Sequence, residues 1–566
     1  MKQVLFPLLI LISFLEINPS LLNKLTFKQE VNFSKNSTIT NSNTSISTSS
    51  PVVFMKPVAT GAGDGSDWDN ALGESDLKVT AEAGGTIYLA AGTYSTSSQI
   101  EIRENLCIIG GFESGITGND TCSYDPITNH TILDGENARR IMRHNNASAD
   151  SIELRGLILE NGNGVGGGGV FFSAVTTSNP IVFKFIDLEV RSNNSNSHGA
   201  IFVNNKNHVD NEIQFKNCHF NFNTGERGAA ISMNRVRNSD NVAFANSGKL
   251  VIEDCFFTNN LATGSGGGAV NIQVSHQWTL RRNKFCNNDT SQGDGGAVRY
   301  FDAHKAIITD CEFDENFSDR DGGAISAFQT ELYLESSDFV GNNVSNQDNG
   351  GAIYGVSSSG IEVVDCKFYS NFAGAGGAIY WDDNFTNTTL NIASNNFFVD
   401  NYITNSSTLN SAGGGAMKIF ESDWLVENNS FVNNSVPAAA FGGAINLDLS
   451  DVELTNNLFF NNQKGTNSNI LGADIIVFED DGNFSPASNN KMQLASAALY
   501  LPQQGPSMPD DYDFTNDTFN NTDDGSLPGA PVIVCPSALV TNCLLDGCEP
   551  PCEADNICYP IQIVKN

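Results

Sequence analysis

Basic residues are scarce in this sequence, and their scarcity excludes one class of partner. Lysine and arginine together number 30, against 64 aspartate and glutamate residues, which gives a formal net charge of −34 at pH 7. A surface of this sign repels the phosphate backbone of nucleic acids and the headgroups of anionic lipids. We therefore expect no nucleic-acid partner.

Long hydrophobic runs are also missing. The longest mostly apolar stretch runs from Val4 to Leu15 and follows the basic residue Lys2. A helix needs about 20 residues to span a bilayer, so this stretch is too short, whereas it fits the apolar core of a signal peptide. We predict a signal peptide over residues 1–24, with no defined cleavage site, and a Ser/Thr/Asn-rich linker over 25–50. The protein is therefore expected to be secreted or displayed at the cell surface.

The sequence also lacks recognised motifs for binding metals or cofactors. Neither an ordered Asp-x-Asp-x-Asp-Gly loop nor the glycine-rich nonapeptide calcium repeat occurs. We predict no cofactor and no dedicated metal site. The alternative that stays open is structural Ca²⁺ held by Asp and Asn side chains at turns, because Ca²⁺ prefers oxygen ligands.

The sequence does contain a two-part motif that recurs along most of its length. The first part is Phe-x-x-Asn, in which the Phe residues are Phe220, Phe257, Phe285, Phe313, Phe339, Phe368, Phe398, Phe431 and Phe459. The second part is Gly-Gly-Ala followed by Ile or Val, which begins at Gly267, Gly295, Gly322, Gly350, Gly376 and Gly442, with variants around Ala200, Ala229, Ala416 and Ala473. One unit is about 28 residues long, a period typical of a solenoid.

Between the motifs, apolar and polar residues alternate as they do in β-strands. The residues seven and five positions before each Phe are mostly apolar, as Leu332 and Leu334 are before Phe339. Short alternating segments broken by Asn and Gly indicate strands separated by tight turns. Parallel stacking of such units places equivalent residues about 4.8 Å apart. The predicted fold is all-β: a right-handed parallel β-helix, a single-stranded solenoid with an N-terminal cap and a cysteine-containing C-terminal tail.

Stacking assigns a role to each repeated residue. Phe is expected to stack on Phe inside the solenoid, and Asn to bond the backbone and the Asn of the next coil. The glycines are expected to supply positive φ and to leave no Cβ at a crowded corner. In one unit Leu390 and Ile392 align with Phe397 instead of the following residue, which predicts a one-residue bulge before Asn401. None of the ladder residues is expected to be catalytic.

The repeat divides the chain into regions. Residues 51–164 are expected to form an N-terminal cap and irregular first coils, because a solenoid needs its open end covered. Regular coils are predicted over 165–487, a linker rich in Pro, Asp and Asn over 488–531, and a cysteine-rich tail over 532–566. Long intervals between motifs predict surface loops, where binding residues are often displayed.

Three groups stand out among the twelve cysteines. Four share one inward column and are expected to be buried and unreactive, namely Cys218, Cys255, Cys311 and Cys366. Cys107 and Cys122 flank a glycine-rich loop and are a candidate disulfide in an exported protein. The tail contains Cys535, Cys543, Cys548, Cys552 and Cys558. Their spacing would suit zinc, but export and the lack of a nearby histidine favour disulfides, and the odd number leaves one thiol unassigned.

At its Phe-x-x-Asn and Gly-Gly-Ala-Ile motifs the chain resembles the repeats of the chlamydial polymorphic outer membrane proteins, which are surface adhesins with a β-helix passenger. The segments Ala59 to Leu72 and Gly84 to Tyr94 are similar to the first coils of large secreted right-handed β-helix proteins of Bacteroidetes. The resemblance covers about residues 53–475 and implies the fold and a place at the cell surface or outer membrane. The chlamydial proteins end in a barrel, whereas too few residues follow the last coil here, so we expect no integral membrane barrel in this chain.

These observations favour a non-catalytic protein that acts in surface adhesion, or in glycan or protein binding. Tyr354 and Tyr380 follow the Gly-Ala motif in the same register of adjacent coils, with Trp381 beside the second. We predict that these rings face outward about 4.8 Å apart, where sugars would stack on them. The expected partner is an extracellular glycan or a surface protein.

A polysaccharide lyase or hydrolase acting on acidic glycans is the alternative. Elimination from a uronate needs a base and a group that neutralises the carboxylate. The candidates are Arg299, His304 and Lys305 on one coil, beside the charged corner 319–321.

Hydrolysis would instead use two carboxylates, and Asp382 and Asp383 are the close pair on a coil. Adjacent residues on a strand point to opposite faces, which weakens this pair. A purely structural spacer is the second alternative, because the motifs specify a fold more strongly than an activity.

Overall fold

A computed structural model describes most of the chain between the predicted N-terminal linker and the predicted C-terminal linker. The described residues are 52–144, 151–164, 167–174, 182–205, 212–235, 250–345, 348–358, 360–383, 390–404, 412–448, 450, 452–465, 475–478, 491–492, 499–500 and 518–519. The predicted signal peptide, the N-terminal linker and the cysteine-rich tail lie outside these residues.

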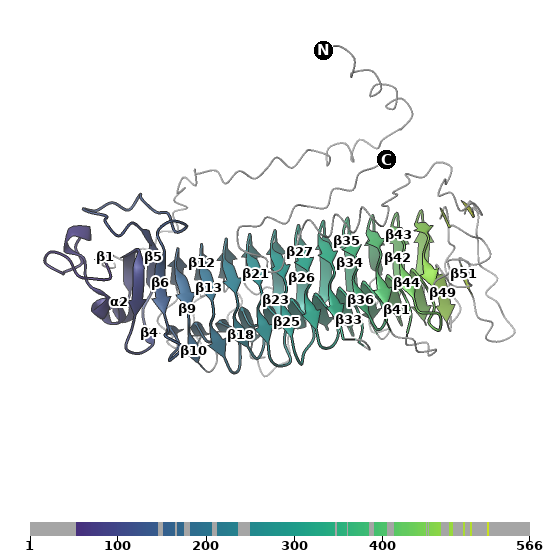
Figure 1. The fold of residues 1–566 in the computed structure, drawn as a ribbon, viewed down its shortest axis with the longest axis horizontal. Helices are drawn as coiled ribbons and strands as arrows, with labels where there is room; N and C mark the ends of the chain where they lie inside the picture. Colours follow the sequence, from purple (N-terminus) through teal and green to yellow (C-terminus); the bar gives the residue numbers. More distant parts are fainter. Residues whose placement is uncertain are drawn as a thin grey trace, which may run out of the picture. The chain divides into compact units, whose positions relative to one another are not determined.

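The described chain winds through successive coils, and each regular coil contributes four strands (Figure 1). Two strands of a coil belong to one large sheet, and the other two belong to a second and a third sheet. Strands pair in parallel with their equivalents one coil away, as β15 does with β19 and β17 with β21. We number the four rows of strands in the order in which the chain visits them.

Rows 1 and 2 form the large sheet. Row 1 follows the Gly-Ala corner and contains β4 (Ile100–Ile102), β7 (Met142–His144), β11 (Val170–Ala174), β15 (Ile201–Asn205), β19 (Ile231–Arg235), β23 (Val270–Arg281), β26 (Val298–Thr309), β29 (Ile325–Phe328), β33 (Ile353–Val356), β37 (Ile379–Asp382), β41 (Met417–Phe420), β45 (Ile445–Asp448), β49 (Ile475–Phe478) and β51 (Leu499–Tyr500). Row 2 contains β1 (Val52–Met55), β2 (Gly85–Ala90), β5 (Leu106–Phe112), β8 (Ser151–Arg155), β12 (Val182–Ile186), β16 (Glu212–Lys216), β20 (Leu250–Glu253), β30 (Glu331–Glu335), β34 (Gly360–Val364), β38 (Asn391–Ser394), β42 (Trp424–Glu427) and β46 (Val452–Thr455). The long strands β23 and β26 run through both rows.

Rows 3 and 4 form the two smaller sheets. Row 3 carries the repeated Phe and contains β3 (Gly92–Ser95), β6 (Thr131–Asp134), β9 (Ile158–Glu160), β13 (Glu189–Arg191), β17 (His219–Asn221), β21 (Phe256–Thr258), β24 (Lys284–Cys286), β27 (Glu312–Asp314), β31 (Asp338–Val340), β35 (Lys367–Tyr369), β39 (Phe397–Val399), β43 (Ser430–Val432), β47 (Leu458–Phe460), β50 (Lys491–Met492) and β52 (Thr518–Phe519). Row 4 contains β10 (Asn163–Gly164), β14 (Asn194–Ser195), β18 (Thr224–Gly225), β22 (Leu261–Ala262), β25 (Asp289–Thr290), β28 (Phe317–Ser318), β32 (Asn343–Val344), β36 (Phe372–Ala373), β40 (Tyr402–Ile403), β44 (Ser435–Val436) and β48 (Gln463–Lys464).

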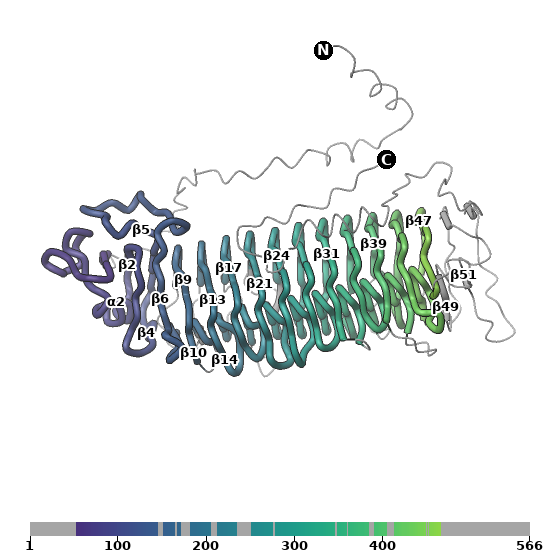
Figure 2. Tube along the Cα trace, in the orientation of Figure 1, coloured from purple at the N-terminus to yellow at the C-terminus, as the bar shows by residue number. Residues whose placement is uncertain are grey.

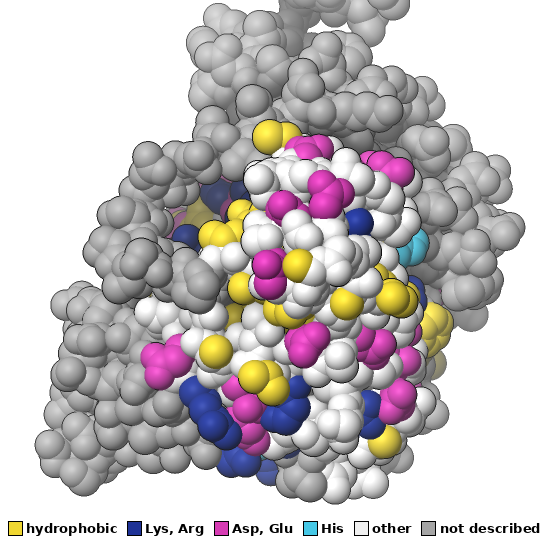
Figure 3. Space-filling view, turned by 90° about the vertical axis from the view of Figure 1, so that its left-hand side faces the viewer, with side chains coloured by type: hydrophobic (Ala, Val, Ile, Leu, Met, Phe, Trp, Pro, Cys, Tyr) yellow, Lys and Arg dark blue, Asp and Glu magenta, His cyan; other side chains and the backbone are white. Residues whose placement is uncertain are grey.

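The N-terminal end of the stack is covered by irregular structure. It contains the short helices η1 (Trp68–Asn70), η2 (Glu74–Asp76) and α2 (Leu77–Ala83). The buried Trp68 packs with Phe54 and Phe112 in a separate apolar cluster, and its indole Nε1 donates to the carbonyl of Asp120 at 2.7 Å. Figure 3 views the molecule from this end, where acidic, basic and small apolar patches alternate on the described surface. The open end of the core is therefore closed by a surface of mixed polarity, as a solenoid requires.

Inside the coils the repeated Phe residues form one continuous stack. From Phe220 to Phe459, neighbouring ring centroids lie 4.6–4.9 Å apart and adjacent ring planes differ by at most 5°. These distances follow the spacing of parallel strands. The predicted Phe ladder is confirmed.

The repeated Asn residues form a second internal ladder. Asn316 Nδ2 donates to the carbonyl of Phe285 on one neighbouring coil and to Oδ1 of Asn342 on the other. The ladder begins one coil earlier than the Phe motif, at Asn193, which follows Val190 instead of a Phe. Successive ladder residues lie 26–37 positions apart, which measures the coil length. These buried amides pair polar backbone groups that would otherwise be unsatisfied inside the protein.

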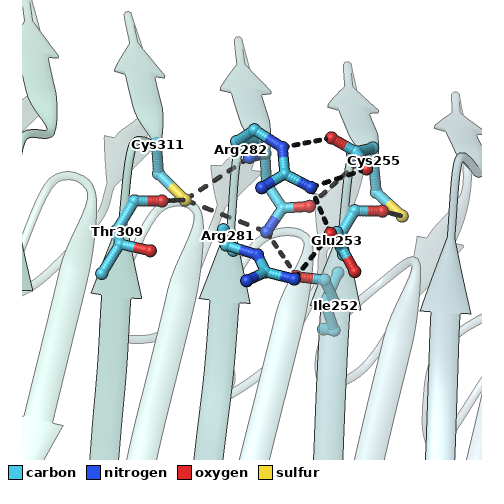
Figure 4. Close-up of polar contacts among 9 residues, drawn as sticks. Ile252, Glu253, Cys255, Arg281, Arg282, Thr309 and Cys311 are labelled. Carbon is cyan, nitrogen blue, oxygen red and sulfur yellow. Dashed lines mark hydrogen bonds and ion pairs between the residues drawn. The ribbon is translucent and has the colours of Figure 1, made fainter.

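A shorter ladder of cysteine and amide side chains runs two positions before the Phe. Figure 4 shows Cys255 and Cys311 two coils apart, on either side of the coil that carries Arg281 and Arg282. Asn283 holds the same ladder position on that middle coil. The backbone N–H of Cys255 donates to Asn283 Oδ1 at 2.9 Å, and Asn283 Nδ2 donates to the carbonyl of Ile252 at 2.8 Å. The four predicted ladder cysteines are buried free thiols, as expected.

From β9 to β47, each row 3 strand is bounded by two residues in the left-handed backbone region. They precede the two ladder positions, as Asp365 (φ 53°) precedes Cys366 and Ser370 (φ 52°) precedes Asn371. This conformation breaks the strict alternation, so that the next side chain also points into the core. Asn and Asp recur at these corners because their short polar side chains tolerate the left-handed region.

The two glycines of the Gly-Gly-Ala corner serve different purposes. The first has positive φ, as in Gly322 (φ 72°). The second faces the backbone of the next coil: a Cβ on Gly323 would lie 2.0 Å from the carbonyl oxygen of Gly351. The two predicted reasons for glycine, positive φ and the lack of room for a Cβ, are therefore both confirmed. The first applies to the first glycine of the pair and the second to the second glycine.

The predicted bulge before Asn401 is wrong. Phe398 pairs with Phe368 in regular register, and the inward positions of the preceding strand are held by Asn391 and Ala393. Leu390 is instead exposed. The buried Asn391 is tolerated because its Oδ1 accepts from the backbone N–H of Ile361 and its Nδ2 donates to the carbonyl of Asp423.

The fold class predicted from the repeat is confirmed: the described chain is an all-β parallel solenoid with almost no helix. The tube in Figure 2 shows the coils stacked in sequence order. Because strand side chains alternate, every coil also presents an outward set of residues that the ladders do not explain.

Candidate functional site

The outward side chains of row 1 include aromatic, basic, acidic and amide groups. Two outward columns run along this row, separated by an inward one. The first column reads, coil by coil, Asn271, Arg299, Ser326, Tyr354, Tyr380, Lys418 and Asn446. The second reads Gln273, Phe301, Phe328, Val356, Asp382, Phe420 and Asp448. We call the part from Arg299 to Asp382, together with Asp294 and Asp321 at the adjacent corner, the aromatic–carboxylate face.

Tyr354 and Tyr380 lie side by side on this face, as the sequence predicts. Their ring centroids are 5.5 Å apart and their planes differ by 30°. Both side chains are half-buried. Burial raises the pKa of each phenol, and the nearby Asp321 and Asp382 carboxylates raise them further. Both groups therefore stay protonated at neutral pH and available as hydrogen-bond donors.

A second aromatic pair stands on the two preceding coils. Phe301 and Phe328 are stacked at 4.8 Å with their planes 9° apart, and both are half-buried. The guanidinium of Arg299 lies 5.0 Å from the Phe301 ring centroid. The two pairs together place four outward rings on four consecutive coils, over about 14 Å at the usual strand spacing.

Carboxylates line the corner beside the rings. Asp321 Oδ1 accepts from the backbone N–H and the side-chain amide of Asn349, at 2.8 and 3.0 Å. Burial raises the pKa of Asp321 to about 6, and the charges of Asp294 and Asp348 act in the same direction. Asp294 in turn pairs with Arg299, whose Nε lies 3.4 Å from Asp294 Oδ2.

The far end of the same columns is closed by a buried ion pair. Lys418 is only 1% exposed, and its Nζ donates to Asn446 Oδ1 at 2.9 Å and to Asp448 Oδ2 at 3.0 Å. Burial lowers the pKa of Lys418, and the charge of Asp448 opposes that shift. In the first column the half-buried groups therefore end at Tyr380, whereas the half-buried Phe420 follows Asp382 in the second column.

The sequence predicts that Trp381 faces outward with the tyrosines, and this prediction is wrong. Its side chain is 0% exposed and belongs to the main core. It lies over Gly355 of the preceding coil, where a Cβ would come within 2.0 Å of the indole Cζ3. Strand alternation explains this correction, because Tyr380 already occupies the outward position next to it.

Two of the three lyase candidates, Arg299 and Lys305, lie in separate ion pairs. Asp302 has positive φ and interrupts the alternation of β26 between Arg299 and His304. Lys305 Nζ lies 2.5 Å from Glu331 Oε1, whereas Arg299 pairs with Asp294. His304 is exposed. Arg299 and Lys305 are therefore held by different acidic neighbours and do not form a joint site.

Asp382 and Asp383 point to opposite faces, as expected from strand alternation. Asp382 lies in the outward column. Asp383 is buried, and its Oδ2 accepts from Asn391 Nδ2 at 3.2 Å. The two carboxylates therefore do not form a joint site on this face.

The predicted Cys107–Cys122 disulfide is wrong in this structure, where both are free thiols. Cys107 stands within β5, in register with Thr86 and Glu153. Cys122 is exposed in the following loop, where its backbone N–H donates to Asp120 Oδ1. Cys286, to which the sequence analysis assigned no role, is instead disulfide-bonded.

The described residues contain no group of three or more His, Cys, Asp and Glu side chains arranged to hold a metal ion. None of their helices has the length and apolar character needed to cross a membrane.

Sequence reasoning missed the Phe301–Phe328 pair and Asp294. A signal for both was present. Phe301 and Phe328 stand three positions after Val298 and Ile325, the last residues of their Gly-Gly-Ala motifs, and Asp294 immediately precedes Gly295. Aligning all the repeat units at every position around the Gly-Gly-Ala motif, and not only at the position directly after it, would have identified these residues.

Comparison with known proteins agrees with the fold and adds no activity. A family described as "Right handed beta helix region" matches residues 222–392, which is less than half of the chain. No curated protein and no solved structure matches the chain. The chain is thus similar to right-handed β-helix proteins over its regular coils, in agreement with the right-handed parallel β-helix predicted from the repeat.

Proposed function

We propose that this protein is an exported, non-catalytic β-helix protein that binds an extended extracellular glycan on the aromatic–carboxylate face. The observation that carries the proposal is the run of four outward rings on four consecutive coils, from Phe301 to Tyr380. The rings stand in two neighbouring columns, Phe301 with Phe328 and Tyr354 with Tyr380, and together form an apolar strip against which successive sugar rings can pack. A rigid solenoid holds them without the entropy cost of ordering a loop on binding.

Polar groups around the rings can form hydrogen bonds with the hydroxyl groups of a sugar. The phenols of Tyr354 and Tyr380 donate, and the carboxylates of Asp321 and Asp382 accept, hydrogen bonds of the kind that sugar hydroxyls form. Binding sites of this composition, mostly apolar with a few polar groups that fix orientation, are usual for small ligands. Because Asp294, Asp321 and Asp382 would repel a uronate, we propose a neutral glycan as the preferred ligand.

Display at the cell surface is part of the proposal. It draws on the apolar N-terminal run and on the resemblance of the repeat to surface adhesins.

A glycan array tests the proposal. Wild-type protein is expected to bind a class of neutral oligosaccharides, and the Tyr380→Ala variant is expected to lose most of that signal. Tyr333→Ala is the matched control, because Tyr333 is also a half-buried tyrosine on a strand but lies in row 2, outside the face. Silence of the wild-type protein on all glycans, or equal loss in both variants, would overturn the proposal.

Hydrolysis of a polysaccharide is the second candidate, and one observation favours it. Asp321 has a raised pKa of about 6 and lies near Asp294 on the adjacent coil. Acid-catalysed glycoside hydrolysis uses two carboxyl groups on one face, and the one that donates the proton has a raised pKa. Release of reducing ends from polysaccharides, abolished in Asp321→Asn, would support catalysis over binding alone.

A further inference from the structure

The outward face of row 3 carries an apolar cluster that is separate from the core. Tyr369, Val399 and Val432 each follow the inward Phe of their coil and form this cluster with Phe397 and Phe460. Outward positions of a surface sheet are normally part exposed, yet these three side chains are only 2–3% exposed. We call this set the row 3 apolar stripe.

Cys286 occupies the same outward register three coils from Tyr369 toward the N-terminus. It follows Phe285 on β24, is in register with Thr258 and Asp314 on the neighbouring strands, and is fully buried. It is also disulfide-bonded, whereas Cys107, Cys122, Cys218, Cys255, Cys311 and Cys366 are free. The remaining cysteines of the chain are the five between Cys535 and Cys558.

The cysteine-rich tail has the length and composition to reach this face. Phe519 on β52 is the last described residue of row 3, eight strands beyond β24, or about 38 Å along the stack. Cys535 comes 16 positions later in the chain, and an extended segment of that length spans about 53 Å. The tail is rich in apolar residues, in the runs Val532 to Val534, Leu544 to Leu545 and Ile561 to Val564.

We propose that residues 532–566 fold back over the row 3 apolar stripe and are fastened there by a disulfide between Cys286 and one of the five tail cysteines. This assignment also resolves the odd number of tail thiols, because Cys286 makes six and permits three disulfides. A cover over the stripe accounts for the low exposure of Tyr369, Val399 and Val432. Closing so long a loop constrains the unfolded chain.

The bond requires an oxidising compartment, so the inference rests on the export that the proposed function includes. The Cys286 thiol and a tail thiol lose two protons and two electrons as the S–S bond forms. A donor disulfide of the export compartment, on a protein oxidoreductase or a small thiol, accepts them and is reduced to two thiols. Such compartments are where structural disulfides form and persist.

Counting free thiols in the full-length exported protein tests the assignment. Alkylation under denaturing, non-reducing conditions is expected to modify six cysteines in the wild type and seven in Cys286→Ser, because the tail partner is released. The matched control Cys311→Ser removes one of the buried free thiols, so its count is expected to fall from six to five. A count that decreases in Cys286→Ser would overturn the proposal, since it would mean that Cys286 is a free thiol.

Peptide mapping of the wild-type protein gives a second readout that needs no variant to fold. A non-reducing digest is expected to contain one cross-linked pair that joins the Cys286 peptide to a peptide from residues 532–566. Cys286 linked to any other cysteine, or recovered as a free thiol, would contradict the inference. Glycan binding is not involved in either readout, so this proposal and the proposed function can fail independently.

Discussion

Asn316 Nδ2 donates a 2.9 Å hydrogen bond to Asn342 Oδ1 on the next coil, and Asn316 Oδ1 accepts from both the backbone and the side chain of Asn288. Replacing Asn316 by alanine would leave buried donors and acceptors unsatisfied on both neighbouring coils. Each such group costs about 1–3 kcal/mol. We expect Asn316→Ala to lower the free energy of unfolding by about 3 kcal/mol or more, measured by urea denaturation.

The control for this variant is Asn343→Ala. Asn343 lies in row 4, is half-buried, and donates to the nearby carbonyl of Gly341. Its loss is expected to cost less than about 1 kcal/mol. Equal destabilisation by the two variants would contradict a special role for the Asn ladder.

The Gly-Ala corner yields a second prediction. A methyl group on Gly323 would lie 2.0 Å from a carbonyl of the next coil, and backbone atoms cannot move aside as a flexible side chain would. Gly323→Ala is therefore expected to lower the melting temperature by several degrees or to prevent folding. Gly341→Asn is the comparison, because Gly341 has φ 62°, a Cβ there would meet only Glu315 Cγ at an ordinary 3.5 Å, and asparagine tolerates that backbone region. Scanning calorimetry should find this variant within about 1 kcal/mol of wild type.

Asp321 gives the stability a defined pH dependence. Its pKa is about 6 in the folded protein against an ordinary value of 3.8, so the folded state holds the proton more tightly. The stability that this group contributes is fully present below about pH 4 and is lost as pH rises through about 6. Asp321→Asn carries no titrating proton and is expected to gain stability relative to wild type as pH rises across this window.

Melting temperatures of both proteins from pH 4 to pH 8 measure this effect. Asp319→Asn is the control, since Asp319 is an exposed carboxylate near the same corner. A difference between wild type and Asp321→Asn that is constant over the whole range would contradict the raised pKa.

The sequence predicts the interior of this molecule far better than its surface. The ladders could be predicted because stacking demands the same residue in every coil, so that Phe339 and Phe368 are informative about each other. Asn391 is an exception, because it stands at an inward position where the other coils have mostly aliphatic residues. The bulge predicted from Leu390 was wrong because a buried amide can replace an aliphatic residue when a neighbouring coil supplies hydrogen-bond partners. Outward positions obey no such rule, because solvent accepts any residue there.

The candidate face was therefore predicted only in part. Tyr354 and Tyr380 were found because they follow the motif directly, whereas Trp381 was assigned to the wrong side of the strand. The raised pKa of Asp321 depends on burial by residues far apart in the sequence. No local pattern carries that information.

Titration calorimetry with the strongest oligosaccharide from the array tests glycan binding by the face most directly. Tyr380→Phe keeps the outward ring and is expected to retain affinity within a few-fold, whereas Tyr380→Ala removes it and is expected to weaken binding about tenfold or more. Equal affinity of wild type and Tyr380→Ala would contradict the account.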